Sequence, residues 1–150
     1  MPRPAPCCVL ACLAATLTTA PTSAQDWPQW RGPNRDGVVT SFESPTVWPR
    51  ELTSRWQVDV GLGYATPLLV DDRIFMFTRQ SDDEVLSALD AASGTSVWRT
   101  AYPAPFEMAH ATFQHGPGPK STPTFADGSL FTRGMSGIVT AFAADTGRTI

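Results

Sequence analysis

Short apolar runs separated by turn-forming residues fill the second half of the chain, and the pattern occurs twice. The first copy, over residues 66–98, contains TPLLVDDRIF and VLSALDAASGTSVW, and the second, over residues 122–150, contains TPTFADGSLF and IVTAFAADTGRTI. Equivalent positions lie 56 residues apart at the start of the copies and 53 apart near their ends, which fits a longer hairpin turn in the first copy. Repeats of short strands at such a period indicate a radial or solenoid β architecture.

The first copy divides into predicted strands because turn residues bound each apolar run. We expect strands over residues 67–70, 73–78, 85–89 and 95–99, with a turn at 71–72 and a polar hairpin loop over 80–84. Gly94 and Gly147 suit tight turns, which need a positive φ. The predicted fold class is all-β: a β-propeller of four-stranded antiparallel blades, of which this chain holds about two.

The predicted propeller part covers residues 54–150. It comprises a closing strand over 54–60 whose blade partners lie elsewhere, a blade over 64–99, an insert over 100–120 and a truncated blade over 121–150. Trp98 stands four residues after Gly94, whereas the position four residues after Gly147 would be 151. We therefore expect the N-terminal part of a longer protein; a complete protein with a degenerate last repeat is the alternative.

The first 24 residues have the pattern of an export signal peptide. Arg3 is followed by a mostly apolar stretch over residues 7–20 and by small residues at 22–24. The apolar stretch is too short for a transmembrane helix, which needs about 20 apolar residues. We therefore expect a periplasmic or secreted protein. The alternative is a lipid anchor at Cys12, where VLAC resembles a lipobox that lacks the usual small residue.

Cysteines and charge exclude several classes of protein. The three cysteines, Cys7, Cys8 and Cys12, all lie in the predicted signal, so the mature segment has no disulfide and no cysteine metal ligand. Removing the signal also removes Arg3 and leaves ten basic and fourteen acidic residues, a net charge near −4. Neither sign is clustered, so no basic footprint for nucleic acid is present.

Residues 25–53 are predicted to be a loop or cap. The stretch DWPQWRGPNRDG combines two tryptophans with prolines and glycines, which exclude a long helix or a central strand. Because exposing the large apolar surface of tryptophan to water costs free energy, we expect this segment to pack over the main body. The alternative is that Trp27 and Trp30 stack on a ligand, and together with Trp48 they would suit a carbohydrate-binding module.

Few residues suggest catalysis or metal binding. Asp90 precedes the turn at Gly94 and is expected to cap it rather than to bind a metal. His110 and His115 lie in the proline- and glycine-rich insert, which is expected to be a structured surface loop, and no third ligand stands at a familiar spacing. Zincin, Walker, Rossmann and GxSxG motifs are absent. The sequence thus assigns no catalytic residue, no metal ligand and no cofactor-binding residue.

The stretch ALDAASGTSVW over residues 88–98 resembles the AxDxxTGxxxW motif of pyrroloquinoline-quinone (PQQ) type propeller repeats. Ser93 replaces the usual threonine, and in the second copy Ala143 replaces the aspartate. The opening of the mature chain and residues 115–123 resemble exported bacterial PQQ-like repeat proteins. The resemblance implies that Trp98 docks between adjacent blades. It also implies that PQQ and calcium are possible in the full-length protein, although none of the family's ligand motifs matches here.

Two functions stand out after this comparison, beside the carbohydrate-binding alternative for the tryptophans. The leading hypothesis is an exported, non-catalytic binding or scaffold protein whose propeller face engages a protein or a small-molecule ligand. The alternative is a PQQ-dependent dehydrogenase that oxidises alcohols or sugars. Fold alone does not decide between them.

Overall fold

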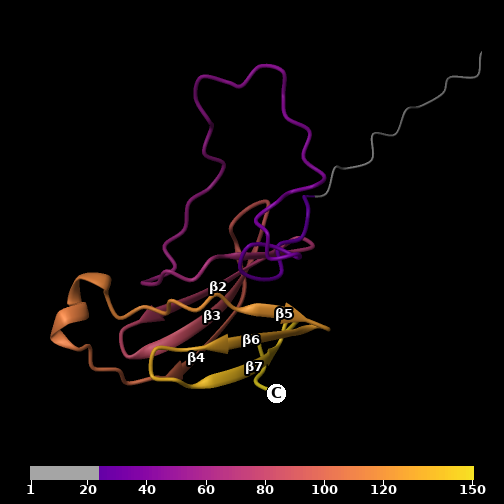
Figure 1. Cartoon of the computed structure of the whole chain (residues 1–150). Helices are drawn as coiled ribbons and strands as arrows, with labels where there is room; N and C mark the ends of the chain where they lie inside the picture. The colour runs from indigo at the N-terminus through magenta and orange to yellow at the C-terminus, as the bar shows by residue number, and fades with distance from the viewer. Residues whose placement is uncertain (1–23) are drawn as a thin grey trace, which may run out of the picture.

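The computed structural model describes residues 24–150, so the predicted signal peptide, including Cys12, lies outside the described residues apart from Ala24. The described chain is built from two antiparallel sheets and one short 3₁₀ helix (Figure 1). The first sheet has the order β1(Leu68–Val70), β2(Arg73–Gln80), β3(Asp83–Asp90), β4(Ser96–Pro103). The helix η1(His110–His115) follows, and then the second sheet, β5(Thr124–Ala126), β6(Ser129–Arg133), β7(Val139–Ala143). The predicted all-β class is confirmed.

The register of the two sheets confirms the repeat. Leu68 pairs with Phe75 in the first sheet, and Thr124 pairs with Phe131 at the equivalent place in the second. The same correspondence continues between β2 and β3 and between β6 and β7, where Arg73 pairs with Asp90 and Ser129 with Ala143. An isolated bridge between Phe142 and Thr149 repeats the pairing of Leu89 with Ser96 that begins β4. The two sheets are therefore consecutive copies of one structural unit.

The extra residues of the first copy lie in its central hairpin, but they lengthen the strands rather than the loop. Residues 80–84 were expected to form a polar loop, and this prediction is wrong: the turn consists of Ser81 and Asp82, and Gln80 and Asp83 already pair across it. The strands continue because their polar side chains find partners, as Arg79 and Glu84 face each other in a buried ion pair. β4 likewise continues to Pro103, beyond the boundary expected at residue 99.

Residues 54–60 pair with neither sheet, and the closing strand expected there stays a prediction, because its blade partners were expected outside this chain. A strand needs a neighbouring backbone with free hydrogen-bonding groups. Instead the next residues make that contact, because Leu62 forms an antiparallel bridge to Arg79 on the edge of β2 that β1 leaves free. Figure 1 shows the segment before it (purple) looping away from the sheets.

The core lies between and within the two sheets. Its buried members come from both copies: Leu68, Val70, Phe75, Phe77, Leu86, Ala88, Leu130, Phe142 and Ala144. The alternation of strand side chains places Phe75 and Phe77 on one face of β2, where they bury their rings almost completely. No helix within residues 24–150 is long and apolar enough to cross a membrane.

Candidate functional sites at the interface of the two sheets

Two tryptophans dock on the turns of the two sheets in the same way. The indole ring of Trp98 packs against Gly147, and its Nε1 donates to the carbonyl oxygen of Ala144 at 3.0 Å. The ring of Trp56 packs against Gly94, and its Nε1 donates to the carbonyl oxygen of Ala91 at 3.1 Å. Each accepting carbonyl stands three residues before its glycine. Trp98 therefore joins the first sheet to the second, as the resemblance implied, although its ring remains partly exposed.

Both glycines are required by this packing. Gly94 and Gly147 have φ values of +72° and +70°, which favour glycine. A Cβ atom on Gly94 would also lie 2.6 Å from Cε3 of Trp56. Glycine is thus required at both positions by the turn conformation and by the tryptophan ring that packs on it.

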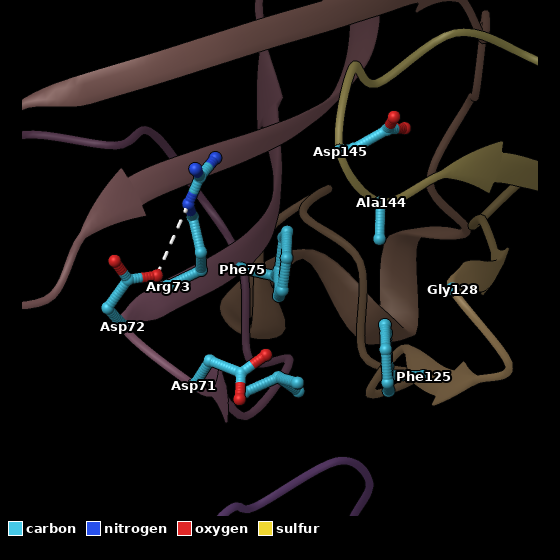
Figure 2. A pocket seen from close by; sticks show the side chains of 9 residues that line it. Asp71, Asp72, Arg73, Phe75, Phe125, Gly128, Ala144 and Asp145 are labelled. Atoms are coloured by element: carbon cyan, nitrogen blue, oxygen red, sulfur yellow. Dashed lines mark ion pairs between the residues drawn. The ribbon is translucent and has the colours of Figure 1, made fainter. Parts of the chain in front are cut away.

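A cleft of about 460 Å³ opens between the sheets beside these docks (Figure 2). The rings of Phe75 and Phe125 are stacked within it, with centroids 6.5 Å apart and planes inclined by 10°. Figure 2 shows carboxylates around these rings. The cleft is lined by Val70, Asp71, Asp72, Arg73, Phe75, Phe125, Gly128, Ala144 and Asp145.

The charges of the cleft are mostly negative. Arg73 is the one cation among its lining residues, and its Nε lies 3.5 Å from Oδ1 of Asp72. Within residues 24–150 the carboxylates of Asp71 and Asp145 form no salt bridge, and Asp145 accepts a hydrogen bond from Thr146. An acidic rim beside the partly exposed ring of Phe125 is chemically suited to a basic side chain, whose aliphatic stem contacts this ring while its head meets carboxylates.

A buried ionic network lies at the end of the long hairpin. Glu84 is fully buried, and its two carboxylate oxygens accept hydrogen bonds from the Tyr102 hydroxyl at 2.8 Å and from the Met135 amide at 2.6 Å. Nη2 of Arg79 lies 3.7 Å from Oε1 of Glu84. Burial and the hydrogen bond to the Glu84 carboxylate raise the pKa of Tyr102 to about 12. The network connects the first sheet with the loop between β6 and β7.

Arg79 extends this network to the insert. Its Nε donates to the carbonyl oxygen of Pro117 at 3.0 Å, and its Nη2 donates to that of Ala104 at 2.7 Å. Sequence reasoning missed the network, because Arg79 and Glu84 were assigned to a polar surface loop or its flank. Their position opposite each other in a two-residue hairpin is the signal that could have indicated a pair.

The N-terminal segment contacts both sheets at equivalent positions. Trp27 forms an antiparallel bridge with Leu69 of β1, and the carbonyl oxygen of Pro28 accepts a hydrogen bond from the amide of Phe125 in β5. A second pocket, of about 340 Å³, lies nearby and is lined by Trp30, Tyr64, Thr66, Lys120, Ser121 and Thr122. The ammonium group of Lys120 lies 4.6 Å from the Tyr64 ring centroid and donates to the carbonyl oxygens of His115 and Gly116.

The family model described as outer membrane protein assembly factor BamB matches residues 35–150. The chain belongs to this family. Its two sheets are consecutive blades of a BamB-like, PQQ-type repeat propeller.

Comparison with known proteins otherwise gives distant matches. The crystal structure of BamB from Moraxella catarrhalis matches with 24% identity and a TM-score of 0.45. The match covers 65% of this chain and 30% of the BamB chain, so the sequence spans less than a third of that structure's length. No curated protein matches this chain.

Within this BamB-like fold, Asp90 acts as a turn residue. Its Oδ1 accepts hydrogen bonds from the amide of Ser93 at 2.8 Å and from the Ser93 hydroxyl at 2.6 Å. The hydrogen bonds from Ser93 lower the pKa of the Asp90 carboxyl below its usual value. The structure therefore places Asp90 in the capping role that its position in the motif predicts.

His110 and His115 occupy the two ends of η1. The ring of His110 contacts that of Phe113 with centroids 5.2 Å apart, and the carbonyl of His115 is bound by Lys120. Across residues 24–150, no three His, Cys, Asp or Glu side chains are grouped so that they could hold a metal ion. The described residues thus offer no calcium site of that kind.

The three tryptophans proposed for carbohydrate binding have different surroundings. Trp27 is partly buried at the edge of β1, and Trp30 is 60% exposed at the second pocket, with the Arg31 guanidinium 5.5 Å from its ring centroid. Trp48 is exposed in the 38–53 segment, where its ring packs against Phe42. Of the three, Trp30 alone lines either of the two pockets described above.

Proposed function

We propose that this protein is an exported, non-catalytic propeller that binds another protein through the face carrying the cleft between its blades. The match to the BamB family model over residues 35–150 is the observation that carries the proposal. The proposed location is the periplasm or the cell exterior, in agreement with the predicted signal peptide. The family is that of an assembly factor for outer membrane proteins, which suggests a scaffold that holds a partner during assembly.

The chemistry of the cleft supports a partner with a basic side chain. Asp71, Asp72 and Asp145 line the opening around the stacked rings of Phe75 and Phe125. A lysine or arginine can bury its aliphatic stem against the partly exposed ring of Phe125 and pair its charge with the carboxylates. Such charge complementarity contributes mainly to the specificity and rate of association.

Zero-length cross-linking tests this proposal directly. A carbodiimide joins a carboxylate to an amine only where the two are in contact, so treatment of cells that export the full-length protein should couple Asp71, Asp72 or Asp145 to lysines of one partner protein. The triple variant Asp71→Asn, Asp72→Asn and Asp145→Asn removes all three coupling carboxylates and should lose that product, whereas Glu43→Gln, in the exposed 38–53 segment, should leave it unchanged. Products that are the same in both variants would refute the role of the cleft.

A second measurement tests the non-catalytic part of the proposal. The full-length protein is supplied with PQQ and calcium, and oxidation of alcohols and sugars is followed with an artificial electron acceptor. We expect no turnover above that of the cofactor alone. Saturable turnover would instead establish the quinoprotein dehydrogenase alternative.

A further inference from the structure

The N-terminal segment uses consecutive residues to contact consecutive blades. Trp27 N donates to Leu69 O at 2.6 Å, and Leu69 N donates to Trp27 O at 3.2 Å. One residue later, Pro28 O accepts from Phe125 N at 2.8 Å. Leu69 and Phe125 are the middle residues of β1 and β5 and hold the same position in the two copies. The segment thus passes from β1 of the first blade to β5 of the second and bonds to both strands.

These contacts use the edge strands of the two sheets. β1 and β5 each end their sheet, so one side of each strand pairs with β2 or β6, while the other side has no neighbouring strand among residues 24–150 and is contacted by Trp27 and Pro28. We call these two sides the inner edges. An unpaired edge is a template for an extended polypeptide, which binds by main-chain hydrogen bonds. A side-chain contact fixes the end of the segment, because Asp26 Oδ1 accepts a hydrogen bond from the amide of Asp71 at 2.9 Å.

The segment is attached to the inner edges by few bonds. Its pairing with β1 is an isolated bridge rather than a continuous strand. The following residues, 38–53, form no helix or strand and expose six large apolar side chains, those of Val38, Val39, Phe42, Val47, Trp48 and Leu52. Segments with few buried contacts open at a low free-energy cost, well below that of global unfolding.

We infer that the inner edges of β1 and β5 are a docking site for an extended polypeptide strand with an aromatic residue at the place of Trp27, and that residues 26–28 fill this site in cis. The N-terminal segment is then a displaceable strand that controls access to the site. The inference rests on the proposed function, that the propeller binds another protein, and it adds that the bound part of this partner is an extended strand.

Hydrogen exchange in the full chain tests the inference. Trp27→Pro removes the amide that donates to Leu69 and should release the segment, whereas Trp27→Phe keeps the amide and an aromatic ring and serves as the matched control. Amide exchange at Leu69 and Phe125 should accelerate about tenfold in Trp27→Pro, the size expected for loss of a backbone hydrogen bond, and stay near wild type in Trp27→Phe.

A synthetic peptide of residues 24–37 then probes the emptied site. Added to Trp27→Pro, it should restore protection at Leu69 and Phe125 in a saturable manner, whereas the same peptide carrying the proline should not. Wild-type protein should show no change, because its own segment already occupies the edges. Absence of any protection by about 1 mM peptide would overturn the inference, because a docking site for this strand should bind it with a Kd below about 1 mM.

Two further outcomes are decisive. If Trp27→Pro also exposes the amides of Val85 and Leu86 in the buried strand β3, the segment is an integral part of the core and the inference fails. Peptide binding without a cross-linked partner in cells would keep the docking site and refute the proposed function. A cross-linked partner without peptide binding would keep the proposed function and refute the docking site.

Discussion

Gly147 combines a turn conformation with a packing surface. Its φ of +70° costs an alanine about 1–2 kcal/mol, and the ring of Trp98 occupies the space that a Cβ atom would need. Gly128 provides a matched control, because it has a φ of +73° but no atom within 4 Å of an added Cβ. The two glycines therefore separate backbone strain from steric overlap.

We predict that Gly147→Ala is more destabilising than Gly128→Ala by about 1–3 kcal/mol, the usual cost of overpacking. Gly128→Ala alone should cost about 1 kcal/mol through its backbone conformation. Urea denaturation of the two variants measures both values. Equal losses would mean that Trp98 is not packed on this turn.

Tyr102 gives the buried network a dependence on alkaline pH. Its pKa is raised from 10.0 in the unfolded chain to about 12, because burial and the Glu84 carboxylate disfavour the phenolate. Between these values the unfolded chain loses the Tyr102 proton while the native state keeps it. The stabilisation is therefore complete below pH 10 and is lost as the pH rises toward 12.

We predict that Tyr102→Phe lowers stability by about 1–3 kcal/mol at pH 8, since it leaves an oxygen of Glu84 without its donor. The difference between wild type and the variant should narrow as the pH rises from 10 to 12. Denaturant titrations at several pH values measure this difference, in which the other titrating groups largely cancel. A constant difference across this range would contradict the raised pKa.

At the scale of elements, the insert between the blades is held at both ends by one side chain. Arg79 binds the carbonyl oxygens of Ala104 and Pro117, which flank η1. Lysine has a single nitrogen and cannot reproduce the planar fork of arginine. We predict that Arg79→Lys accelerates chymotryptic cleavage within residues 104–117 several-fold, because the freed loop opens locally more often.

The control for this experiment is Arg99→Lys. Arg99 bonds to the side chain of Gln80 at the surface, outside the insert, so cleavage of the insert should not change. Identical digestion of the Arg79 and Arg99 variants would show that the insert is held by other contacts.

The elements differ in how far their sequences predicted them. The strands of the two sheets were predictable because turn residues and apolar runs recur in both copies, and their registers agree in both sheets. The length of the β2–β3 hairpin could not be predicted, because Glu84 is buried against Gly134 and Met135 in the distant loop between β6 and β7. The pairing of Trp27 with Leu69 was also hidden, since a local pattern does not identify the partner of a distant loop.

At the scale of the whole molecule, the repeat architecture makes the free energy of unfolding approximately a sum of terms from each blade and from each interface between neighbouring blades. Trp56 docks on the turn of the first sheet and Trp98 on that of the second, and the hydrogen bonds go to different carbonyls. Repeat architectures with such nearest-neighbour interfaces behave as a chain of units with separate interface terms. Mutations that share no contact partner generally add in free energy.

We predict that Trp56→Ala and Trp98→Ala each cost about 2–4 kcal/mol, somewhat less than a fully buried tryptophan because both rings are partly exposed. The double variant should lose the sum of the two within about 0.5 kcal/mol. Chemical denaturation of the four proteins of this double-mutant cycle measures the interaction term directly. A loss much smaller than the sum would show that one dock depends on the other, and that the two blades form a single cooperative unit rather than successive ones.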